Sequence, residues 1–308
     1  MLNISYIFPG QGAQTVGMGK EFYEFSPEAR AIFDQADQIL KNGLTNVIFN
    51  GPVDKLTSTA YCQPAIVTFS VAALRALEAH PRFKNVSPRF VAGLSLGEYS
   101  ALAACGALSF EDTLKLVERR STFMEEATQM SPGKMAAVIG LDKEKILAIC
   151  AKAGAEVANY NSPQQIVITG HADKVDKAVE QIKAAGAKSV IPLDVAGGFH
   201  SSLMQPAADK FAGILNVTMI KDPRVPVVSN VDAQPVTLPE MIRKNLSRQI
   251  TSSVRWVDTI QYIAGQGVTD FIEIGPGKVL SGLLRRIDKN LKCFNIEKPE
   301  DIEKIEIH

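Results

Sequence analysis

The segment 89–108 places a serine between two glycines at the point where a buried strand gives way to a helix. The pentapeptide Gly-Leu-Ser-Leu-Gly at 93–97 carries this serine, Ser95. A strand before the pentapeptide and a helix after it favour a nucleophile elbow, a sharp turn that presents a serine hydroxyl. Larger side chains at the two glycine positions would collide in such a turn. The simpler alternative is a glycine-rich turn in which the serine caps the helix.

Strands and helices alternate along most of the chain, which predicts an α/β fold with a parallel sheet. Between about Lys134 and Val195 the predicted order is β-α-β-β-α-β, the ferredoxin-like arrangement. We therefore predict a large α/β subdomain formed by 1–127 and 199–308, and a ferredoxin-like small subdomain at 128–198.

Several predicted elements bear on the position of the serine. A helix is predicted at 64–80, a long amphipathic helix at 110–130 and a strand at 225–230. The polar tail after Asn295 is expected to be loosely held.

Composition excludes several classes of function. The 308 residues carry 33 basic and 33 acidic side chains, and the absence of a long basic block argues against nucleic-acid binding. No apolar run approaches the ~18 residues of a membrane span, and the N-terminus does not resemble a signal peptide. Because the four cysteines lack metal-ligand spacing, we expect no metal and a cytoplasmic location.

A serine nucleophile needs a base, and the chain has only four histidines. His80 stands at a helix end before a proline, His171 opens a helix of the small subdomain, and His308 is the last residue. His200 follows two glycines where the small subdomain rejoins the large one, so elimination favours it. No acidic triad partner is evident from spacing, and a backbone carbonyl could hold the imidazole tautomer instead.

Seven segments in order resemble the malonyl-CoA:acyl carrier protein transacylase family, the free-standing acyltransferases of fatty acid synthesis. The resemblance covers nearly the whole chain and implies a hydrolase-like α/β core with a ferredoxin-like insertion. The segments are 8–19, 93–108, 116–124, 158–170, 199–210, 225–233 and 271–283.

The resemblance implies a catalytic role for five residues. Ser95 would be the nucleophile and His200 the general base, with the imidazole oriented by the backbone carbonyl of Gln249. The backbone N–H groups of Gln11 and Leu96 would form the oxyanion hole. The reaction would be ping-pong through a malonyl-serine ester, with no cofactor beyond coenzyme A as part of the substrate.

The resemblance also implies how the acyl group is recognised. Arg120 would bind the malonyl carboxylate, since a guanidinium can pair with it in bidentate fashion. The alternative for Arg120 is a surface salt bridge, and Arg119 is its natural control. Asn161 and Gln63 fall at positions that line the same pocket. Phe199, directly before the histidine, would leave little room for an α-methyl branch.

One position departs from the family pattern. The family usually has histidine before the nucleophilic serine, and this chain has Leu94. Neither the oxyanion hole nor the general base needs that side chain, so we expect an active enzyme with altered pocket polarity.

The implied partners are malonyl-CoA and acyl carrier protein, with neither nucleic acid nor membrane, and we expect a monomer. Three alternatives remain. A polyketide acyltransferase acting in trans would use the same chemistry with another carrier. A serine esterase usually has its histidine near the C-terminus, and Arg120 would have no clear role there. A non-catalytic carrier-protein binder would not need Ser95, His200 and Arg120 together.

Overall fold

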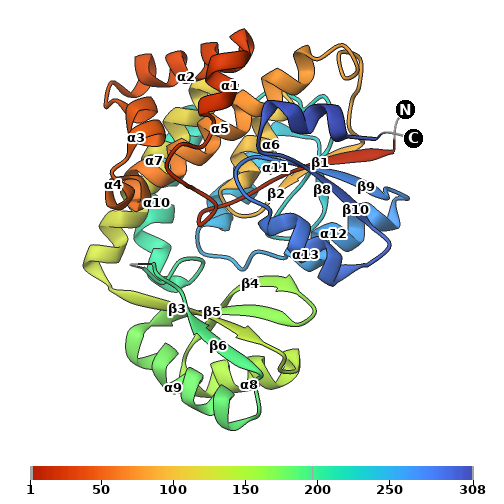
Figure 1. Cartoon of the computed structure of the whole chain (residues 1–308). Coiled ribbons are helices and arrows are strands. Elements are labelled where there is room, and N and C mark those ends of the chain that lie inside the picture. Colours follow the sequence, from red (N-terminus) through yellow and green to blue (C-terminus); the bar gives the residue numbers. More distant parts are fainter. Residues whose placement is uncertain (1–2, 196, 307–308) are drawn as a thin grey trace.

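The computed structural model describes residues 3–195 and 197–306 and contains two sheets, a six-stranded one and a four-stranded one (Figure 1). The larger sheet is mainly parallel and is flanked by helices, and the smaller is antiparallel. The predicted fold class, an α/β core with a smaller subdomain, is therefore confirmed.

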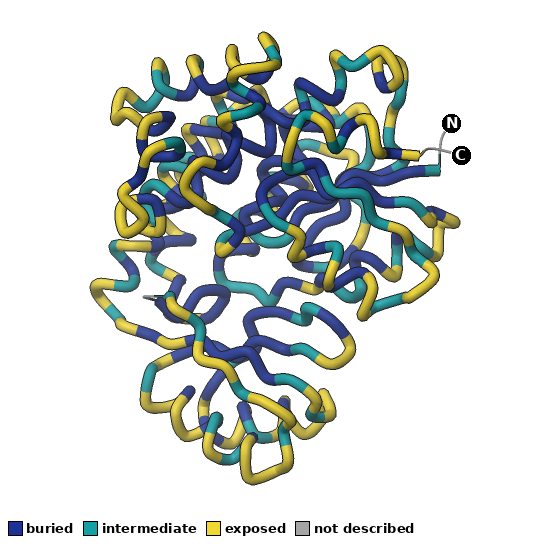
Figure 2. Tube along the Cα trace, in the orientation of Figure 1, coloured by how far each residue is buried: buried dark blue, intermediate teal, exposed yellow. Residues whose placement is uncertain are grey.

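The large sheet has the strand order β10-β9-β1-β2-β7-β8, with only the last pair antiparallel. Every residue of β1 and β2 is buried, as expected for a parallel sheet covered on both faces (Figure 2). The segment predicted as a strand at 225–230 is paired only at 227–228. The strands are β1 (Ile4–Phe8), β2 (Phe90–Gly93), β7 (Val227–Val228), β8 (Pro235–Val236), β9 (Asp270–Ile274) and β10 (Lys292–Ile296).

Helices pack on both faces of this sheet because side chains alternate along each strand. Ile7 and Phe271 face a cluster that contains α12 and α13, and Tyr6 and Phe8 face the larger cluster that contains α2, α5, α6 and α7. The helices are α1 (Lys20–Phe25), α2 (Pro27–Leu40), α3 (Leu44–Asn50), α4 (Val53–Thr57), α5 (Thr59–Ala79), α6 (Gly97–Ala104), α7 (Phe110–Met130), α10 (Gln205–Val217), α11 (Pro239–Gln249), α12 (Trp256–Gly265) and α13 (Val279–Ile287), with the 3-10 turns η1 (Ser202–Met204) and η2 (Pro299–Lys304).

Helix α5 begins five residues before the predicted start at Pro64. Proline is favoured in the first turn of a helix, but Pro64 lies inside this one. The 21-residue helix is long and apolar enough to cross a membrane by length and composition alone. However, 83% of the qualifying window is buried inside the protein, which is the behaviour of a core helix.

The small sheet has the antiparallel order β4-β5-β3-β6 and the chain order β-α-β-β-α-β. Helices α8 and α9 cover one face, and Met135, Ala137 and Val167 on the other face join the large core. The predicted boundary at 128 falls within the last turn of α7, and the division into subdomains stays a prediction. The elements are β3 (Gly133–Ile139), α8 (Lys143–Ala153), β4 (Glu156–Ser162), β5 (Gln165–His171), α9 (Ala172–Ala184) and β6 (Ser189–Pro192).

The loop after α11 pairs with the outer edge of β4. The Val254 amide donates to the Ala158 carbonyl (2.8 Å), and the Tyr160 amide donates to the Val254 carbonyl (2.9 Å). This pairing joins the small sheet to the large subdomain.

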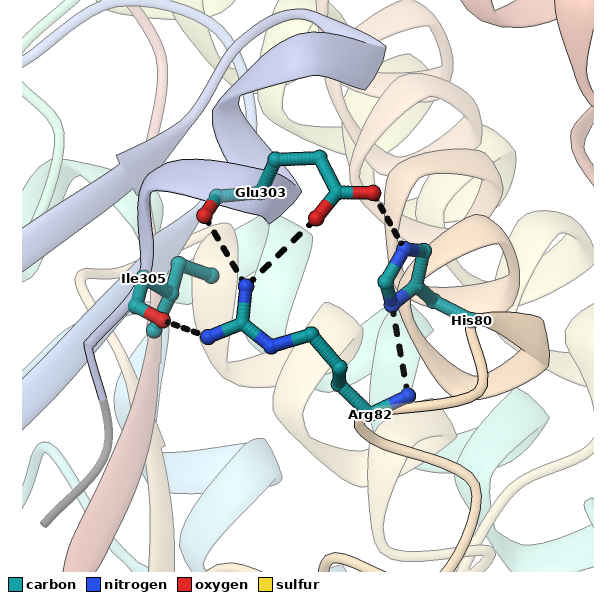
Figure 3. Close-up of polar contacts among 4 residues, drawn as sticks. All are labelled: His80, Arg82, Glu303 and Ile305. Atoms are coloured by element: carbon teal, nitrogen blue, oxygen red, sulfur yellow. Dashed lines mark hydrogen bonds and ion pairs between the residues drawn. The ribbon is translucent and has the colours of Figure 1, made fainter.

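The expectation of a loosely held tail was wrong. Residues 292–296 form β10, and Ile302 and Ile305 are buried beyond it. Figure 3 shows how polar contacts hold this segment. The Glu303 carboxylate lies 2.9 Å from His80 Nε2, and Arg82 donates to the Glu303 carbonyl, also at 2.9 Å.

Candidate active site

A cavity of about 520 Å³ lies between the two sheets, at the carboxyl ends of β1 and β2. Crevices at this end of a parallel sheet are the usual ligand sites of α/β folds. Residues from the small subdomain, including Met135 and Val167, form the opposite wall. Seven of the nine predicted site residues line the cavity: Gln11, Ser95, Leu96, Arg120, Asn161, Phe199 and His200.

The turn that carries Ser95 requires both glycines. A Cβ at Gly93 would lie 1.9 Å from the backbone carbon of Gly97, and a Cβ at Gly97 would lie 2.1 Å from the Phe8 carbonyl oxygen. Ser95 itself has a φ of 54°, in the left-handed region that non-glycine residues rarely adopt. This strained geometry is the one expected of a nucleophile elbow rather than of a helix cap.

Asn230 fixes the backbone of this turn, and sequence reasoning did not identify it. Its Oδ1 accepts from the Ser95 amide (2.6 Å), and its Nδ2 donates to the Gly93 carbonyl (2.7 Å). Asn230 follows β7, which neighbours β2 in the sheet, so the two strand ends meet at one edge. The sheet order, which the sequence does not specify, is the signal that would have revealed it.

His200 is the only one of the described histidines that reaches Ser95. Its Nε2 lies 2.7 Å from the serine Oγ, and its Nδ1 lies 2.9 Å from the Gln249 carbonyl and 3.1 Å from the Ser252 carbonyl. Because carbonyl oxygens can only accept, Nδ1 carries the proton and Nε2 faces the serine as an acceptor. Gln249 lies where the family resemblance implied, and Ser252 is an additional partner.

The environment keeps this imidazole neutral. Burial, followed by the nearby Arg120 charge, lowers the pKa of His200 to about 4, although the two backbone carbonyls act in the opposite direction. His200 also has a φ of 59°. A neutral imidazole in contact with the hydroxyl is the state that a general base needs.

The other histidines lie elsewhere. His80 contacts Glu303 at the C-terminal segment, and the exposed His171 precedes α9 at the end of β5. His308 lies outside the described residues.

Arg120 is buried, with only 1% of its surface exposed, whereas Arg119 is exposed. The spacing of α7 explains the difference, since Arg120 falls on the same apolar face as Val117 and Met124. Nη1 donates to Gln63 Oε1 (2.8 Å), and Nη2 donates to Ser95 Oγ (3.2 Å). Among the described residues Arg120 forms no salt bridge, so the surface-pair interpretation does not hold.

The electrostatic state of Arg120 is that of a desolvated cation. Burial lowers its pKa, and the guanidinium lies 5.5 Å from the centre of the Tyr99 ring. Its Nε has no hydrogen-bond partner among the residues that the structure describes. A charge of this kind, beside a serine hydroxyl, is suited to pairing with an anionic part of a ligand.

Gln63, Asn161 and Phe199 occupy three different places. Gln63 does not line the cavity, but it holds Arg120 from α5. Asn161 lines the cavity, and its buried Oδ1 is without a partner in the described part of the chain. Phe199 is 7% exposed and forms part of the wall beside His200.

The family resemblance assigns the oxyanion hole to the backbone amides of Leu96 and Gln11, and both residues line the cavity with Ser95. Leu96 precedes the first residue of α6, where N–H groups point out of the helix. Gln11 lies in the loop after β1, which packs closely on the elbow, because a Cβ at Gly10 would lie 2.5 Å from the Leu94 carbonyl oxygen. Across residues 3–195 and 197–306, neither amide donates to a protein acceptor. Both are therefore open to an oxyanion.

Leu94 adds an apolar side chain to the cavity. It is half-buried, lines the cavity and packs against the cluster that contains Leu280 and Leu283. The wall beside the elbow is therefore apolar where a histidine would have offered a polar group.

The cysteines are placed for packing rather than for chemistry. All four are free thiols, and burial raises the pKa of Cys62 and Cys293 to about 12 and of Cys105 and Cys150 to about 11. In the described ranges no group of three or more His, Cys, Asp or Glu side chains has the spacing to hold a metal ion.

Comparison with known proteins places the chain among acyltransferases. A model of the acyl transferase domain family matches residues 5–298. A malonyl CoA-acyl carrier protein transacylase from Bacillus subtilis (strain 168) is 46% identical over 310 residues, covering 98% of this chain and 96% of the relative. A relative of the same name from Staphylococcus aureus (strain MRSA252) is 42% identical, covering 98% of both chains.

Solved structures agree with these relatives. The malonyl CoA-acyl carrier protein transacylase from Coxiella burnetii superimposes with a TM-score of 0.94 at 40% identity, covering 98% of this chain and 96% of that one. A type II PKS acyl-carrier protein in complex with its malonyl-transacylase gives a TM-score of 0.94 at 38% identity, covering 98% of both chains.

Proposed function

Since the chain belongs to the malonyl CoA-acyl carrier protein transacylase family, we propose that it transfers the malonyl group from malonyl-CoA to the phosphopantetheine thiol of acyl carrier protein, in fatty acid biosynthesis. The observation that carries the proposal is the position of Arg120. Its buried guanidinium lies 3.2 Å from the Ser95 hydroxyl, where it can pair with the free carboxylate of a malonyl group bound at the serine.

In the first half of the reaction, Ser95 Oγ attacks the thioester carbonyl as His200 Nε2 takes the hydroxyl proton. The amides of Gln11 and Leu96 hold the oxyanion of the tetrahedral intermediate. The intermediate collapses, the carbon–sulfur bond breaks, and coenzyme A leaves as a thiol with the proton from His200. Arg120 exchanges its contact with Ser95 for the malonyl carboxylate.

In the second half, the carrier thiol occupies the place that coenzyme A left. His200 Nε2 takes the thiol proton, and the sulfur attacks the ester carbonyl. The second tetrahedral intermediate releases Ser95 Oγ, which recovers its proton from His200. Each half uses the same groups, and neither step calls on a metal or a redox cofactor.

The test is the intact mass of the protein after mixing with malonyl-CoA. We expect an increase of one malonyl group, which carrier protein removes and which Ser95→Ala abolishes. Replacing His200 by alanine should slow both acylation and transfer by ~10²–10⁴-fold. Malonylation that persists in Ser95→Ala would place the nucleophile elsewhere.

A polyketide carrier is the second candidate partner. A structural relative at 38% identity is described as a malonyl-transacylase in complex with a type II PKS acyl-carrier protein, and the chemistry would be the same. Transfer rates to a fatty acid carrier and to a polyketide carrier, measured side by side, decide between them. We also propose a cytoplasmic monomer, and the four free thiols support the reducing compartment. Sedimentation velocity tests the monomer.

A further inference from the structure

Glu98 is a buried carboxyl group for which the proposed mechanism has no role. It lies in the first turn of α6, three residues after Ser95, and is 3% exposed. Every residue of α6 is buried, so this carboxyl group has no access to bulk water. Burying such a group costs free energy unless hydrogen bonds satisfy it.

One oxygen of Glu98 holds two residues of the active site. Its Oε2 accepts from Gln249 Nε2 at 2.5 Å and from the Asn230 backbone amide at 3.4 Å. Asn230 and Gln249 lie 132 and 151 positions after Glu98 in the sequence, so the fold brings them to it.

Gln249 reaches three groups of the site. Its backbone carbonyl accepts from His200 Nδ1 (2.9 Å), its Nε2 also donates to the Ser95 carbonyl (3.0 Å), and its Oε1 accepts weakly from Arg120 (3.4 Å). A glutamine side chain has several rotatable bonds, so its position depends on these contacts. The contact with Glu98 is the shortest of the hydrogen bonds that its side chain makes.

Asn230 performs the corresponding task for the serine. Its side chain bridges the Ser95 amide and the Gly93 carbonyl, and so holds the strained turn closed. Its own backbone amide is the group that donates to Glu98.

We infer that Glu98 is a positioning residue whose side-chain oxygen, through Gln249 and Asn230, keeps Ser95 and His200 in hydrogen-bonding alignment. The inference rests on the proposed function of those two residues. Glu98 itself touches neither the serine hydroxyl nor the imidazole. A displacement of about 1 Å at reacting groups can cost ~10²-fold in rate.

The geometry requires an acceptor oxygen rather than a negative charge. Both hydrogen bonds end on the same oxygen, and the carbonyl oxygen of a carboxamide can accept both. Glu98→Gln should therefore keep the alignment, and Glu98→Leu, of similar size but without an acceptor, should lose it.

The experiment measures single-turnover acylation by malonyl-CoA in the full chain, with kcat and KM for transfer to carrier protein. We expect Glu98→Leu to lower kcat ~10²-fold with little change in KM, because Gln63 still holds Arg120 in the malonyl site. Glu98→Gln should stay within several-fold of the wild type. Ile302→Ala, a buried residue of η2 remote from the site in the chain, serves as a control for a general loss of stability.

Each outcome decides the inference. Selective loss of kcat in Glu98→Leu, with rescue by Glu98→Gln, supports it. An unchanged kcat in folded Glu98→Leu overturns it, as does a Glu98→Gln variant that folds but is as slow as a dead enzyme. If Glu98→Leu does not fold, the Glu98→Gln rate alone decides. Malonylation of Ser95→Ala, measured in parallel, would instead refute the proposed function.

Discussion

Arg120 brings a positive charge into the acyl pocket that is incompletely satisfied before substrate binds. Its Nη atoms contact neutral oxygens only, and its Nε has no partner in the described residues. In the proposed mechanism a malonyl carboxylate would give the Arg120 guanidinium an anionic partner, whereas an acetyl group would not. Sites built around a buried polar group discriminate strongly against ligands that leave it unpaired.

Replacing Arg120 by alanine should therefore change substrate choice and not only rate. We expect malonyl transfer to fall and acetyl transfer to be kept or raised, so that the ratio of the two kcat/KM values drops by ~10²-fold or more. Arg119→Ala is the control, because Arg119 is exposed and should leave the ratio unchanged. An unchanged ratio in Arg120→Ala would mean that the carboxylate is recognised elsewhere.

As the proposed general base, His200 should determine how the acylation rate depends on pH. With a pKa lowered to about 4 by burial and by Arg120, the imidazole stays neutral at pH 6, where a solvated histidine would be largely protonated. The single-turnover rate should therefore fall only as the pH approaches 4. A fall in the single-turnover rate centred at pH 6.5 would instead indicate that the base is exposed to solvent.

Stability must be measured over the same pH range, because the unfolded chain binds a proton at His200 below its ordinary pKa of 6.5 and the folded chain does not. The folded state should therefore lose stability as the pH falls from 6.5 toward 4. Circular dichroism at each pH separates this unfolding from the protonation of the base.

At the scale of elements, the strand–elbow–helix unit depends on close contact between α6 and β1. A Cβ at Gly97 would meet the Phe8 carbonyl at 2.1 Å, and that backbone oxygen is fixed in the sheet. Gly97→Ala should lower the free energy of unfolding by several kcal/mol and abolish acylation, as measured by urea unfolding and intact mass.

Gly213→Ala in α10 is the matched control for that substitution, because a Cβ there meets no atom within 4 Å. Because alanine loses less backbone entropy than glycine on folding, Gly213→Ala should raise the free energy of unfolding by about 0.5–1 kcal/mol. If the two alanine variants behaved alike, the tight contact at the elbow would not be what the glycine provides.

Elements with a local signal could be predicted from the sequence. The glycines around Ser95 predicted the elbow, and the β-α-β-β-α-β order predicted the small antiparallel sheet. Arg120 was singled out by the family resemblance alone, and its place on the buried face of α7 is seen only in the structure. The start of α5 was misplaced because Pro64 is an ambiguous signal, which put Gln63 before the helix instead of within it.

The supporting groups of the site had no local signal. In the sequence, Glu98 resembles any acidic residue in the first turn of a helix, and Asn230 is the last residue of the strand predicted at 225–230. Their roles follow from sheet order and from contacts more than 130 residues apart. The tail was misjudged for the same reason, since its partners His80 and Arg82 lie far away in the chain.

At the scale of the whole molecule, the buried carboxyl group of Glu98 makes stability depend on pH. Burial raises its pKa from 4.5 to about 7, and nearby Asp232 adds to the shift. Hydrogen bonds from Gln249, Asn230 and Ser229 oppose the shift. The Glu98 charge in turn raises the pKa of Arg120, against the effect of burial. The folded state therefore binds a proton more tightly than the unfolded state, and loses stability as the pH rises through this window.

Comparing wild type with Glu98→Gln isolates this contribution. The wild type should lose stability relative to the variant between pH 4.5 and 7, by on the order of 3 kcal/mol above that window. Urea unfolding at several pH values provides the measurement. If the free energies of unfolding of the two proteins changed with pH in parallel, ionising Glu98 in the folded state would carry no free-energy cost.

The pairing of Val254 with β4 has a consequence for how this architecture can be divided. On the outer edge of β4, Val254 from the loop after α11 forms an isolated parallel bridge with Asn159, with two backbone hydrogen bonds. Excised as a fragment, residues 131–195 would lose this partner and expose the Ala158 carbonyl and the Tyr160 amide at a sheet edge, where a strand of another molecule can pair. We expect such a fragment to self-associate, and sedimentation velocity measures this. The small sheet would then depend on the rest of the chain to stay monomeric and could not be transferred to another protein by itself.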